Sequence, residues 1–388
     1  MTSQPAHTWG LPPWKIDFRP PQRALPARVD FAVIGGGFTG LAAAAWLRLL
    51  APEKSVAVLE ASRIGAGASG RTGGMALAET AAGAQRGLGD VLAGLENILK
   101  KLRVRCDLRL GGAWEIARKP GSKSRVSARS PIEWNDSGTL RVVNEVPGGT
   151  LDPGKLVSGL ARAAHRLGAG IYENHRVASV AWSATPEIHA GDGRGNIRRI
   201  TAAKIIFATN ALSLDVAGLS DGLHPRLTLA MLAAPASEKA LRAIGLAERK
   251  PFYTVDFPYL WGRVRGDRSV VWGAGLVQSP DEDDLDRVDI SAPEPAQIFA
   301  RLEERVRNLH PALEKTNFTH RWGGPILFRD NWKPVFDWHP QSIAHGKNAI
   351  VIGAFAGHGV ALSSYLGAWA AEILLHRRTL PAWGAIKS

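Results

Sequence analysis

The chain of 388 residues contains one cysteine, Cys106. A single cysteine cannot form a disulfide within the chain, and it excludes metal centres built from several thiolates. So little cysteine suits a reducing compartment, and we expect a cytoplasmic protein. The first residues also lack a basic segment followed by an apolar one, so we expect no secretory signal peptide.

Long hydrophobic runs are scarce as well. Only the stretches 31–47 and 349–371 are conspicuously apolar and free of Asp, Glu, Lys and Arg. Clustered glycines divide each of them into a β-branched run and an alanine-rich helical pattern. A membrane-spanning helix needs about 20 continuous apolar residues. These stretches therefore predict buried strand–turn–helix units, and we expect no membrane span.

Negative charge is in short supply, since 48 Lys and Arg against 35 Asp and Glu give a net charge of +13. Such a balance can indicate nucleic acid, an anionic membrane or acidic substrates. The densest basic segment, 118–130, contains Gly, Ser and Pro but no interleaved aromatic residue. That pattern is more typical of a solvated loop, and we do not expect nucleic acid as a partner.

Glycine, by contrast, is abundant, and the segment 30–62 has the order of a nucleotide-binding βαβ unit. Gly35 permits a tight turn, Gly37 allows the backbone to approach a pyrophosphate, and Gly40 allows close helix packing. The second strand ends in Glu60, whose carboxylate can accept both ribose hydroxyls and would repel a 2′-phosphate. The unit therefore favours NAD or the adenosine half of FAD over NADP.

A second glycine run, 63–79, repeats the G-x-G-x-x-G spacing without its context. Its first glycine, Gly65, comes only five residues after Glu60; the run has no strand of its own and continues with more glycines where a helix should run. We interpret it as a loop whose backbone and Arg71 form the other wall of the first site. Without a second complete nucleotide unit, electrons should come from an organic substrate and not from NAD(P)H.

Four ordered motifs resemble a known family. GGGFTG with Glu60 and the run GAGASGRTGG are similar to FAD enzymes of the D-amino-acid oxidase and glycine oxidase superfamily. The similarity is strongest to the branch of bacterial gamma-glutamylputrescine oxidase and sarcosine oxidase. KIIFATNAL (204–212) resembles the strand beneath the FAD, and VIGAFAGHGVALSSYLG (351–367) resembles the C-terminal flavin-binding strand, turn and helix.

The resemblance implies an α/β fold with a discontinuous, Rossmann-like FAD-binding domain and an inserted substrate domain of α+β type built on an antiparallel sheet. The expected boundaries are 1–29 for an N-terminal arm, 30–80, 150–215 and 335–388 for the FAD-binding domain, and 81–149 and 216–334 for the substrate domain. Local patterns add a helix and strand within 151–174, a hairpin within 259–275 and a helix within 290–313.

The resemblance also implies FAD as the cofactor. It is expected to be noncovalent, because the family's anchoring cysteine would correspond to a position near Gly324, and because 63–75 contains no histidine. The residues expected to contact FAD are Gly35, Gly37, Phe38, Thr39, Gly40, Glu60, Ala61, Ser62, Gly67, Ser69, Gly70, Arg71, Thr72, Gly73, Gly74, Met75, Val177, Thr209, Asn210, Gly353, Phe355, Gly357, His358, Gly359 and Val360.

In this family the flavin takes a hydride from the α-carbon of an amine or amino acid, and dioxygen then reoxidises it to give hydrogen peroxide. The catalytic candidates are His358, Arg263, Trp322 and Lys333, and the candidate substrate cage is Tyr259, Trp261, Phe328 and Trp332. Family positions that hold a substrate carboxylate correspond here to Ala76 and Ala361. Arg263 or Arg265 could serve in their place.

Several alternatives stay open. A dehydrogenase would pass the same electrons to a quinone or a carrier protein. A tRNA-modifying FAD oxidase would explain the basic charge and would bind tRNA in a salt-sensitive way. A flavin-binding protein without catalysis is a third possibility. The sequence specifies neither the substrate nor whether the protein is a monomer or a homodimer.

Overall fold

The structure, a computed structural model, describes residues 8–119, 130–219, 222–278 and 285–386. Its first unit is the predicted βαβ, in which β1 (Arg28–Ile34) and β2 (Val56–Leu59) pair in parallel on either side of α1 (Phe38–Leu50) in sequence. Both strands are almost wholly buried, as expected of parallel strands that are covered on both faces. The prediction of this unit is confirmed.

Further strands extend this unit into the first sheet. Its order is β17 (Val335–Trp338), β18 (Ala349–Gly353), β11 (Ile197–Phe207), β1, β2 and β8 (Gly170–Tyr172), and the hairpin of β9 (Arg176–Ala181) and β10 (Glu187–Gly191) extends from β11. The strands β18, β11, β1, β2 and β8 are parallel, whereas β17 is antiparallel. Their carboxyl ends therefore meet along one edge.

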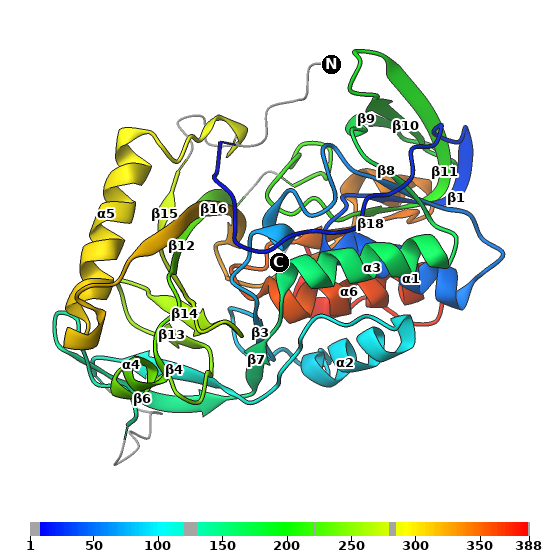
Figure 1. The fold of residues 1–388 in the computed structure, drawn as a ribbon. Helices are drawn as coiled ribbons and strands as arrows, with labels where there is room; N and C mark the ends of the chain where they lie inside the picture. The colour runs from blue at the N-terminus through cyan, green and yellow to red at the C-terminus, as the bar shows by residue number, and fades with distance from the viewer. Residues whose placement is uncertain (1–7, 120–129, 220–221, 279–284, 387–388) are drawn as a thin grey trace.

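Helices cover this sheet in the right half of Figure 1. α1 packs against α6 (Gly359–Leu374) and α3 (Pro153–Arg166), and α2 (Val91–Leu102) packs against α6. Asp152 caps α3 by accepting from the Lys155 amide at 2.9 Å, with Pro153 in the first turn as predicted. α6 approaches α1 so closely that a Cβ on Gly367 would lie 2.3 Å from the carbonyl of Thr39.

The second sheet has the order β16 (Phe318–Arg329), β12 (Leu223–Ala233), β15 (Val270–Val277), β14 (Trp261–Val264), β13 (Phe252–Thr254), β4 (Ala113–Ala117), β6 (Thr139–Val146) and β5 (Trp134–Asn135). Neighbouring strands are antiparallel except for β13 and β4, which are parallel. That pair joins two segments far apart in the chain, so no hairpin constrains its direction.

The hairpin expected within 259–275 is β14 and β15, and the helix expected within 290–313 is α5 (Pro293–Asn308), which packs on β15 at the left edge of Figure 1. The remaining helical segments are short: α4 (Glu238–Ala243), η1 (Ala68–Gly70), η2 (Leu285–Arg287), η3 (Pro311–Leu313), η4 (Pro340–His345) and η5 (Ala382–Gly384).

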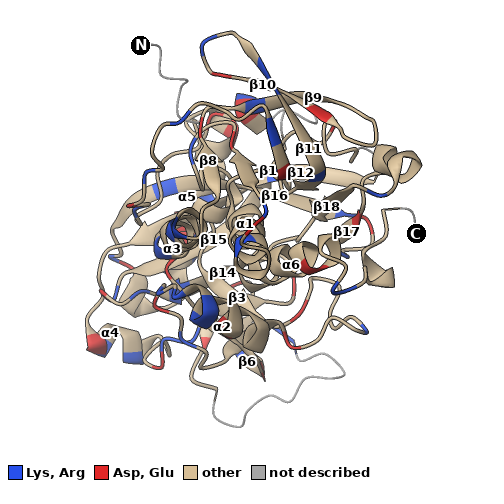
Figure 2. Ribbon diagram, turned by 90° about the vertical axis from the view of Figure 1, so that its right-hand side faces the viewer, with Lys and Arg blue, Asp and Glu red and all other residues tan. Residues whose placement is uncertain are grey.

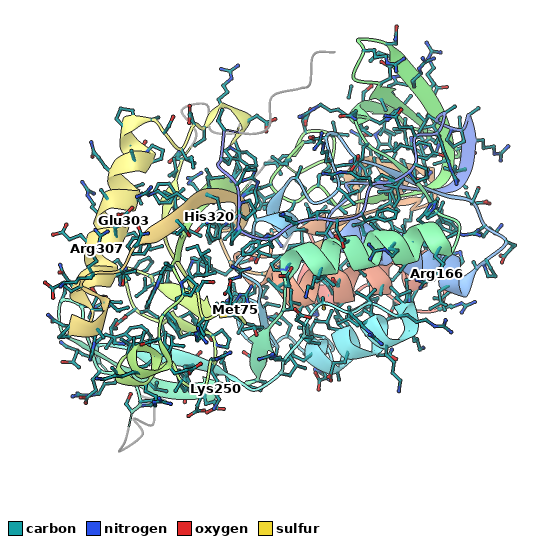
Figure 3. The ribbon with its side chains drawn as sticks, in the orientation of Figure 1. Met75, Arg166, Lys250, Glu303, Arg307 and His320 are labelled. Atoms are coloured by element: carbon teal, nitrogen blue, oxygen red, sulfur yellow. The ribbon has the colours of Figure 1, made fainter. Side chains whose placement is uncertain are left out.

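A pair of short strands and the N-terminal arm both help to join the halves of the molecule. β3 (Met75–Leu77) pairs with β7 (Gly148–Thr150), and Figure 3 places Met75 at the centre of the molecule. The N-terminal arm crosses the front in Figure 1, and Gly10 forms a β-bridge to Trp322 of β16. The arm is therefore an integral part of the described fold.

Lys and Arg are spread over several helices, strands and loops in Figure 2. Most of the basic segment 118–130 lies outside the described residues, which stop at 119 and resume at 130. Across the ranges that the structure describes, no helix is long and apolar enough to cross a membrane.

Candidate active site

A cavity of about 1020 Å³ opens at the carboxyl ends of the parallel strands. Gly35 follows β1, Glu60 follows β2, Thr209 follows β11 and Phe355 follows β18, and all four line it. This edge is where open α/β sheets bind their ligands, because the strand ends and helix N-termini converge there. The sequence motifs, far apart in the chain, are thus brought to one cavity.

The first glycine turn has no space for side chains. Gly35 has a φ of +110°, and a Cβ on Gly37 would lie 2.7 Å from Oγ of Ser69. That hydroxyl accepts a hydrogen bond from the Phe38 amide at 2.9 Å. Because α1 begins here, its N-terminal amides and positive dipole end lie at the cavity wall, as binding of a pyrophosphate requires.

Glu60 is held by the backbone around it. One carboxylate oxygen accepts from the Gly36 amide at 2.7 Å, and the other accepts from the Ser62 amide at 2.9 Å. These two bonds fix the orientation of the carboxylate, and Glu60 lines the cavity. This geometry fits the ribose-binding role that the sequence suggests.

The second glycine run forms a loop, residues 63–75, which we call the glycine loop. It contains only the single turn η1 before β3 begins, so no α-helix opens there and the interpretation as a loop is confirmed. Three side chains from outside the loop donate to its carbonyls: Trp14 Nε1 to Gly70 at 2.5 Å, Trp322 Nε1 to Arg71 at 2.8 Å, and Arg263 Nε to Gly73.

Arg71, expected to help form the other wall of the site, lines the cavity, and its guanidinium is bonded to the backbone. It donates to the carbonyls of Ala66 at 3.0 Å, Gly10 at 2.8 Å and Gly323 at 3.1 Å, and it stacks over the ring of Trp9. Burial lowers its pKa to about 10, so it stays charged at neutral pH. The side chain thus ties the glycine loop to the arm and to β16.

His358 lies at the N-terminal cap of α6, after Gly357 with its φ of +89°. Its Nδ1 lies 3.1 Å from the carbonyl oxygen of Glu79. A carbonyl can only accept, so Nδ1 carries the hydrogen and Nε2 is left as an acceptor. Burial lowers the pKa of His358, which keeps the ring neutral at neutral pH.

One face of the second sheet forms the opposite wall. Neighbouring residues across successive strands make a row that we call the cross-strand row: Trp322, Ala230, Gly273, Trp261, Tyr253, Glu115 and Asn144. Residues in register point to the same face of a sheet, and all but Gly273 and Asn144 line the cavity. The ring of Trp261 lies against Gly73 and Gly273, where a Cβ would fall 2.3 Å and 2.0 Å from its atoms.

The residues around the cavity fit FAD. The hydroxyls of Thr209 and Ser363 are buried at its wall and have no hydrogen-bond partner among the described residues, so a ligand could satisfy them. The glycine turn, Glu60 and the N-termini of α1 and α6 supply the donors and acceptors that a dinucleotide needs. The cavity is also at the upper end of the range found for small-molecule sites.

Comparison with known proteins agrees with this geometry. The family model described as DAO, FAD dependent oxidoreductase, matches residues 30–373. The chain belongs to this family. Gamma-glutamylputrescine oxidoreductase of Escherichia coli (strain K12) is 27% identical, with 89% of this chain and 83% of that protein covered. The protein is therefore an FAD-dependent oxidoreductase.

Solved structures share the fold. Glycine oxidase from Geobacillus kaustophilus superposes with a TM-score of 0.70 at 18% identity, covering 93% of this chain and 99% of that one. L-proline dehydrogenase from P. horikoshii superposes with a TM-score of 0.69 at 17% identity, covering 93% of this chain and 98% of that one. The expected FAD-binding fold is thus confirmed.

Most residues predicted for the site of this DAO-family protein line the cavity. They are Gly35, Gly37, Phe38, Thr39, Glu60, Ala61, Ser62, Gly67, Ser69, Arg71, Thr72, Gly73, Met75, Val177, Thr209, Asn210, Phe355, Gly357, His358, Gly359 and Val360 for the cofactor, and Trp322, Tyr259, Trp261, Phe328 and Trp332 on the substrate side. Sequence motifs more than 300 residues apart thus share one wall.

Six predicted residues are not part of this lining: Gly40, Gly70, Gly74, Gly353, Arg263 and Lys333. A Cβ on Gly40 would lie 2.0 Å from the carbonyl of Gly35, so that glycine serves helix packing. Arg263 is buried against the glycine loop, and burial lowers its pKa to about 10. Lys333 follows Trp332 but does not reach the cavity, and Arg265 pairs with Asp267 in the hairpin turn.

The sequence analysis did not identify the polar end of the cross-strand row, formed by Tyr253, Glu115 and Asn144. Glu115 and Tyr253 both line the cavity, as does Glu79, which follows β3. A local signal existed for one of them, because Glu115 is the lone charge in the strand AWEIA. Its neighbour across the sheet could not be read from the sequence, since the register of β4 and β13 joins residues 138 positions apart.

Proposed function

We propose that this protein oxidises the C–N bond of a small amine or amino acid to an imine, which water then hydrolyses to a carbonyl compound and an amine or ammonia. Noncovalently bound FAD supplies the two-electron acceptor for the hydride of the α-carbon, and dioxygen accepts those electrons to give hydrogen peroxide. Membership of the family establishes FAD as the cofactor, and we add the class of substrate and the electron acceptor.

One observation supports it above all: a single cavity joins the nucleotide motifs to the aromatic wall of the second sheet. Glu60 and Val177, where an adenosine would bind, line this cavity, and so do Trp261, Tyr253 and the N-terminus of α6. A second ligand could therefore lie against the ring system of a bound dinucleotide. Aromatic faces of this kind attract cationic amines.

Two features of this chain would assist the reaction. The N-terminus of α6, at Gly357 to Gly359, presents backbone donors and a positive dipole end that stabilise negative charge at the flavin edge. The Nε2 atom of His358 is unprotonated and can accept a hydrogen bond from a substrate amine. Release of a hydride from the α-carbon requires the neutral amine, and a neutral ring favours that form more than a protonated ring would.

Noncovalent binding of FAD is supported by the position of the one thiol. Cys106 is buried and is not among the residues that line the cavity, whereas Gly324 does line it. Burial raises the pKa of Cys106 to about 12, so its thiolate is scarce at neutral pH. Covalent attachment through sulfur would need both access and a thiolate.

The test is anaerobic reduction. The FAD-loaded protein is mixed without oxygen with a panel of primary and secondary amines and amino acids, and the flavin absorbance is followed. Bleaching by at least one of them is expected. A flavin that stays oxidised with the whole panel would contradict the proposed reaction and favour a binding protein without catalysis.

The electron acceptor needs a second step, because a dehydrogenase performs the same first half-reaction. The structural relatives include both a glycine oxidase and an L-proline dehydrogenase. Mixing the reduced protein with air-saturated buffer in a stopped-flow instrument separates the two. Fast reoxidation with formation of hydrogen peroxide is expected, and slow reoxidation with fast transfer to a quinone would replace the oxidase by a dehydrogenase.

A further inference from the structure

The arginines that line the cavity are already engaged. Arg71 donates to backbone carbonyls. Arg305 pairs with Asp136 at 2.6 Å, and Arg176 pairs with Asp286 at 3.2 Å. Among the described residues of the lining, these are the three guanidinium groups, and no lysine joins them. A carboxylate on the substrate would therefore have to compete with existing partners for a cation.

Glu115 presents the opposite charge to the cavity. One of its oxygens accepts from the hydroxyl of Tyr253 at 2.8 Å, and the other accepts from the side-chain amide of Asn144 at 3.0 Å. Both donors are neutral, and among the described residues no cation forms an ion pair with this carboxylate. Two of its acceptor directions are used, so it keeps capacity for a further donor.

The same end of the cavity carries a second carboxylate, that of Glu79, which is exposed and lines the wall. Tyr253 experiences both charges, because its pKa is raised first by burial, then by the negative charge of Glu115, and further by Glu79. The rings of Tyr253 and His358 stand edge to face, with their centroids 6.5 Å apart. Glu115, Tyr253 and His358 thus follow one another along the wall.

We propose that Glu115 anchors a second, non-reacting cationic group of the substrate, so that the substrate is a diamine or a longer polyamine and not an amino acid held by its carboxylate. This inference rests on the proposed oxidation of an amine in the same cavity. The reacting nitrogen must be neutral, whereas a nearby carboxylate favours the protonated form of an amine. Glu115 therefore suits the nitrogen that keeps its charge, and Tyr253 and Trp261 add aromatic surface for it.

The turnover experiment varies only the far end of the substrate. Linear primary amines from butyl to octyl are compared with the diamines and the ω-amino acids of the same chain length, by anaerobic reduction of the FAD-loaded protein. At the best length the diamine should give a rate constant over dissociation constant at least about tenfold above that of the monoamine, since a charged hydrogen bond contributes this much. The ω-amino acid should be the poorest of the three.

The matched variant is Glu115→Gln. The glutamine can still accept from Tyr253, and it can donate to Asn144 once that amide turns over, so both hydrogen bonds survive. The diamine preference should shrink about tenfold while the monoamine is little affected. Glu133→Gln is the control, because Glu133 is an exposed residue of the same region that pairs with Arg141 at 3.1 Å. It should leave the preference unchanged.

A binding measurement separates this inference from the proposed reaction. Butyltrimethylammonium has no lone pair on nitrogen and cannot be oxidised by this route. Calorimetric titration of the FAD-loaded protein should show that it binds more tightly than pentanoate. Glu115→Gln should weaken its binding about tenfold, because the charge–charge attraction is lost; the quaternary nitrogen has no N–H to donate. If the binding results are as expected but no amine bleaches the flavin, the cation site is supported and the proposed oxidation is contradicted. Equal binding of butyltrimethylammonium to the wild type and to Glu115→Gln would overturn the anchoring role of Glu115, and so would tighter binding of pentanoate. Equal rates of flavin reduction by the monoamine and the diamine would overturn it as well.

Discussion

The indole nitrogen of Trp14 donates a 2.5 Å hydrogen bond to the carbonyl of Gly70, so the N-terminal arm is joined directly to the glycine loop. Trp14 also packs edge to face on Trp322, with ring centroids 5.4 Å apart, and Trp322 holds the next carbonyl of the loop. A segment outside the nucleotide-binding motifs therefore supports the shape of one wall of the cavity.

Replacing Trp14 by Phe keeps the ring packing and removes this hydrogen bond. The buried carbonyl of Gly70 would lose its partner, at a cost of about 1–3 kcal/mol, and the Kd for FAD should rise about tenfold. Trp46→Phe is the control, since it loses a comparable bond, 3.0 Å to Glu372, between α1 and α6. Both variants should lower the Tm, but only Trp14→Phe should raise the Kd. An equal change of Kd in the two would show that the arm acts only through general stability.

The first glycine turn predicts a second effect on cofactor binding. In Gly37→Ala the new Cβ would lie 2.7 Å from Oγ of Ser69, and that hydroxyl would have to release the amide of Phe38. We expect the Kd for FAD to rise more than tenfold, since the methyl group also stands where the pyrophosphate approaches. Gly111→Ala is the matched control, because nothing lies within 4 Å of its Cβ. Fluorescence titration with FAD measures both, and unchanged binding in Gly37→Ala would place the pyrophosphate elsewhere.

The elements around FAD could be predicted because their signals are local. The βαβ unit, the turn at Gly357 and the failure of the second glycine run to start a helix all follow from spacing within short windows. The partners of Arg71 could not be predicted, because its carbonyl acceptors come from the arm and from β16. Likewise, the pairing of Tyr253 with Glu115 depends on sheet register, which sequence periodicity does not fix.

His339 gives a prediction for pH. It is 2% exposed, its Nε2 lies 3.2 Å from the carbonyl of Val216, and its Nδ1 accepts from the Gln341 amide at 3.2 Å, so the neutral ring satisfies both sides. Burial lowers its pKa to about 4. As the pH falls below about 6.5, the unfolded chain takes up the proton first, so the free energy of unfolding should fall toward pH 4 by roughly 3 kcal/mol.

Urea denaturation at several pH values checks this effect. His339→Gln should be less stable at pH 7 but should show a flatter dependence between pH 6.5 and 4 than the wild type, because it has no proton to take up. Other groups titrate in both proteins, so the difference between the two curves is the relevant quantity. Parallel curves would mean that His339 does not hold a lowered pKa.

The noncovalent state of FAD has a simple readout. After acid precipitation of the loaded protein, the flavin should appear entirely in the supernatant, because Cys106 is buried and is not part of the cavity lining. Cys106→Ser should bind FAD in the same amount as the wild type. Flavin that remains with the precipitated wild-type protein would contradict this assignment, and its loss in the variant would identify sulfur as the attachment point.

The central test identifies the compound that donates electrons to the flavin. The FAD-loaded protein is mixed anaerobically in separate reactions with NADH, with NADPH, and with the terminal amines and diamines described above, and the flavin absorbance is recorded. We expect bleaching by at least one amine and none by either nicotinamide, because the described residues contain one complete nucleotide-binding unit and the glycine loop forms its second wall. Rapid bleaching by NADH or NADPH, with no response to any amine, would contradict it.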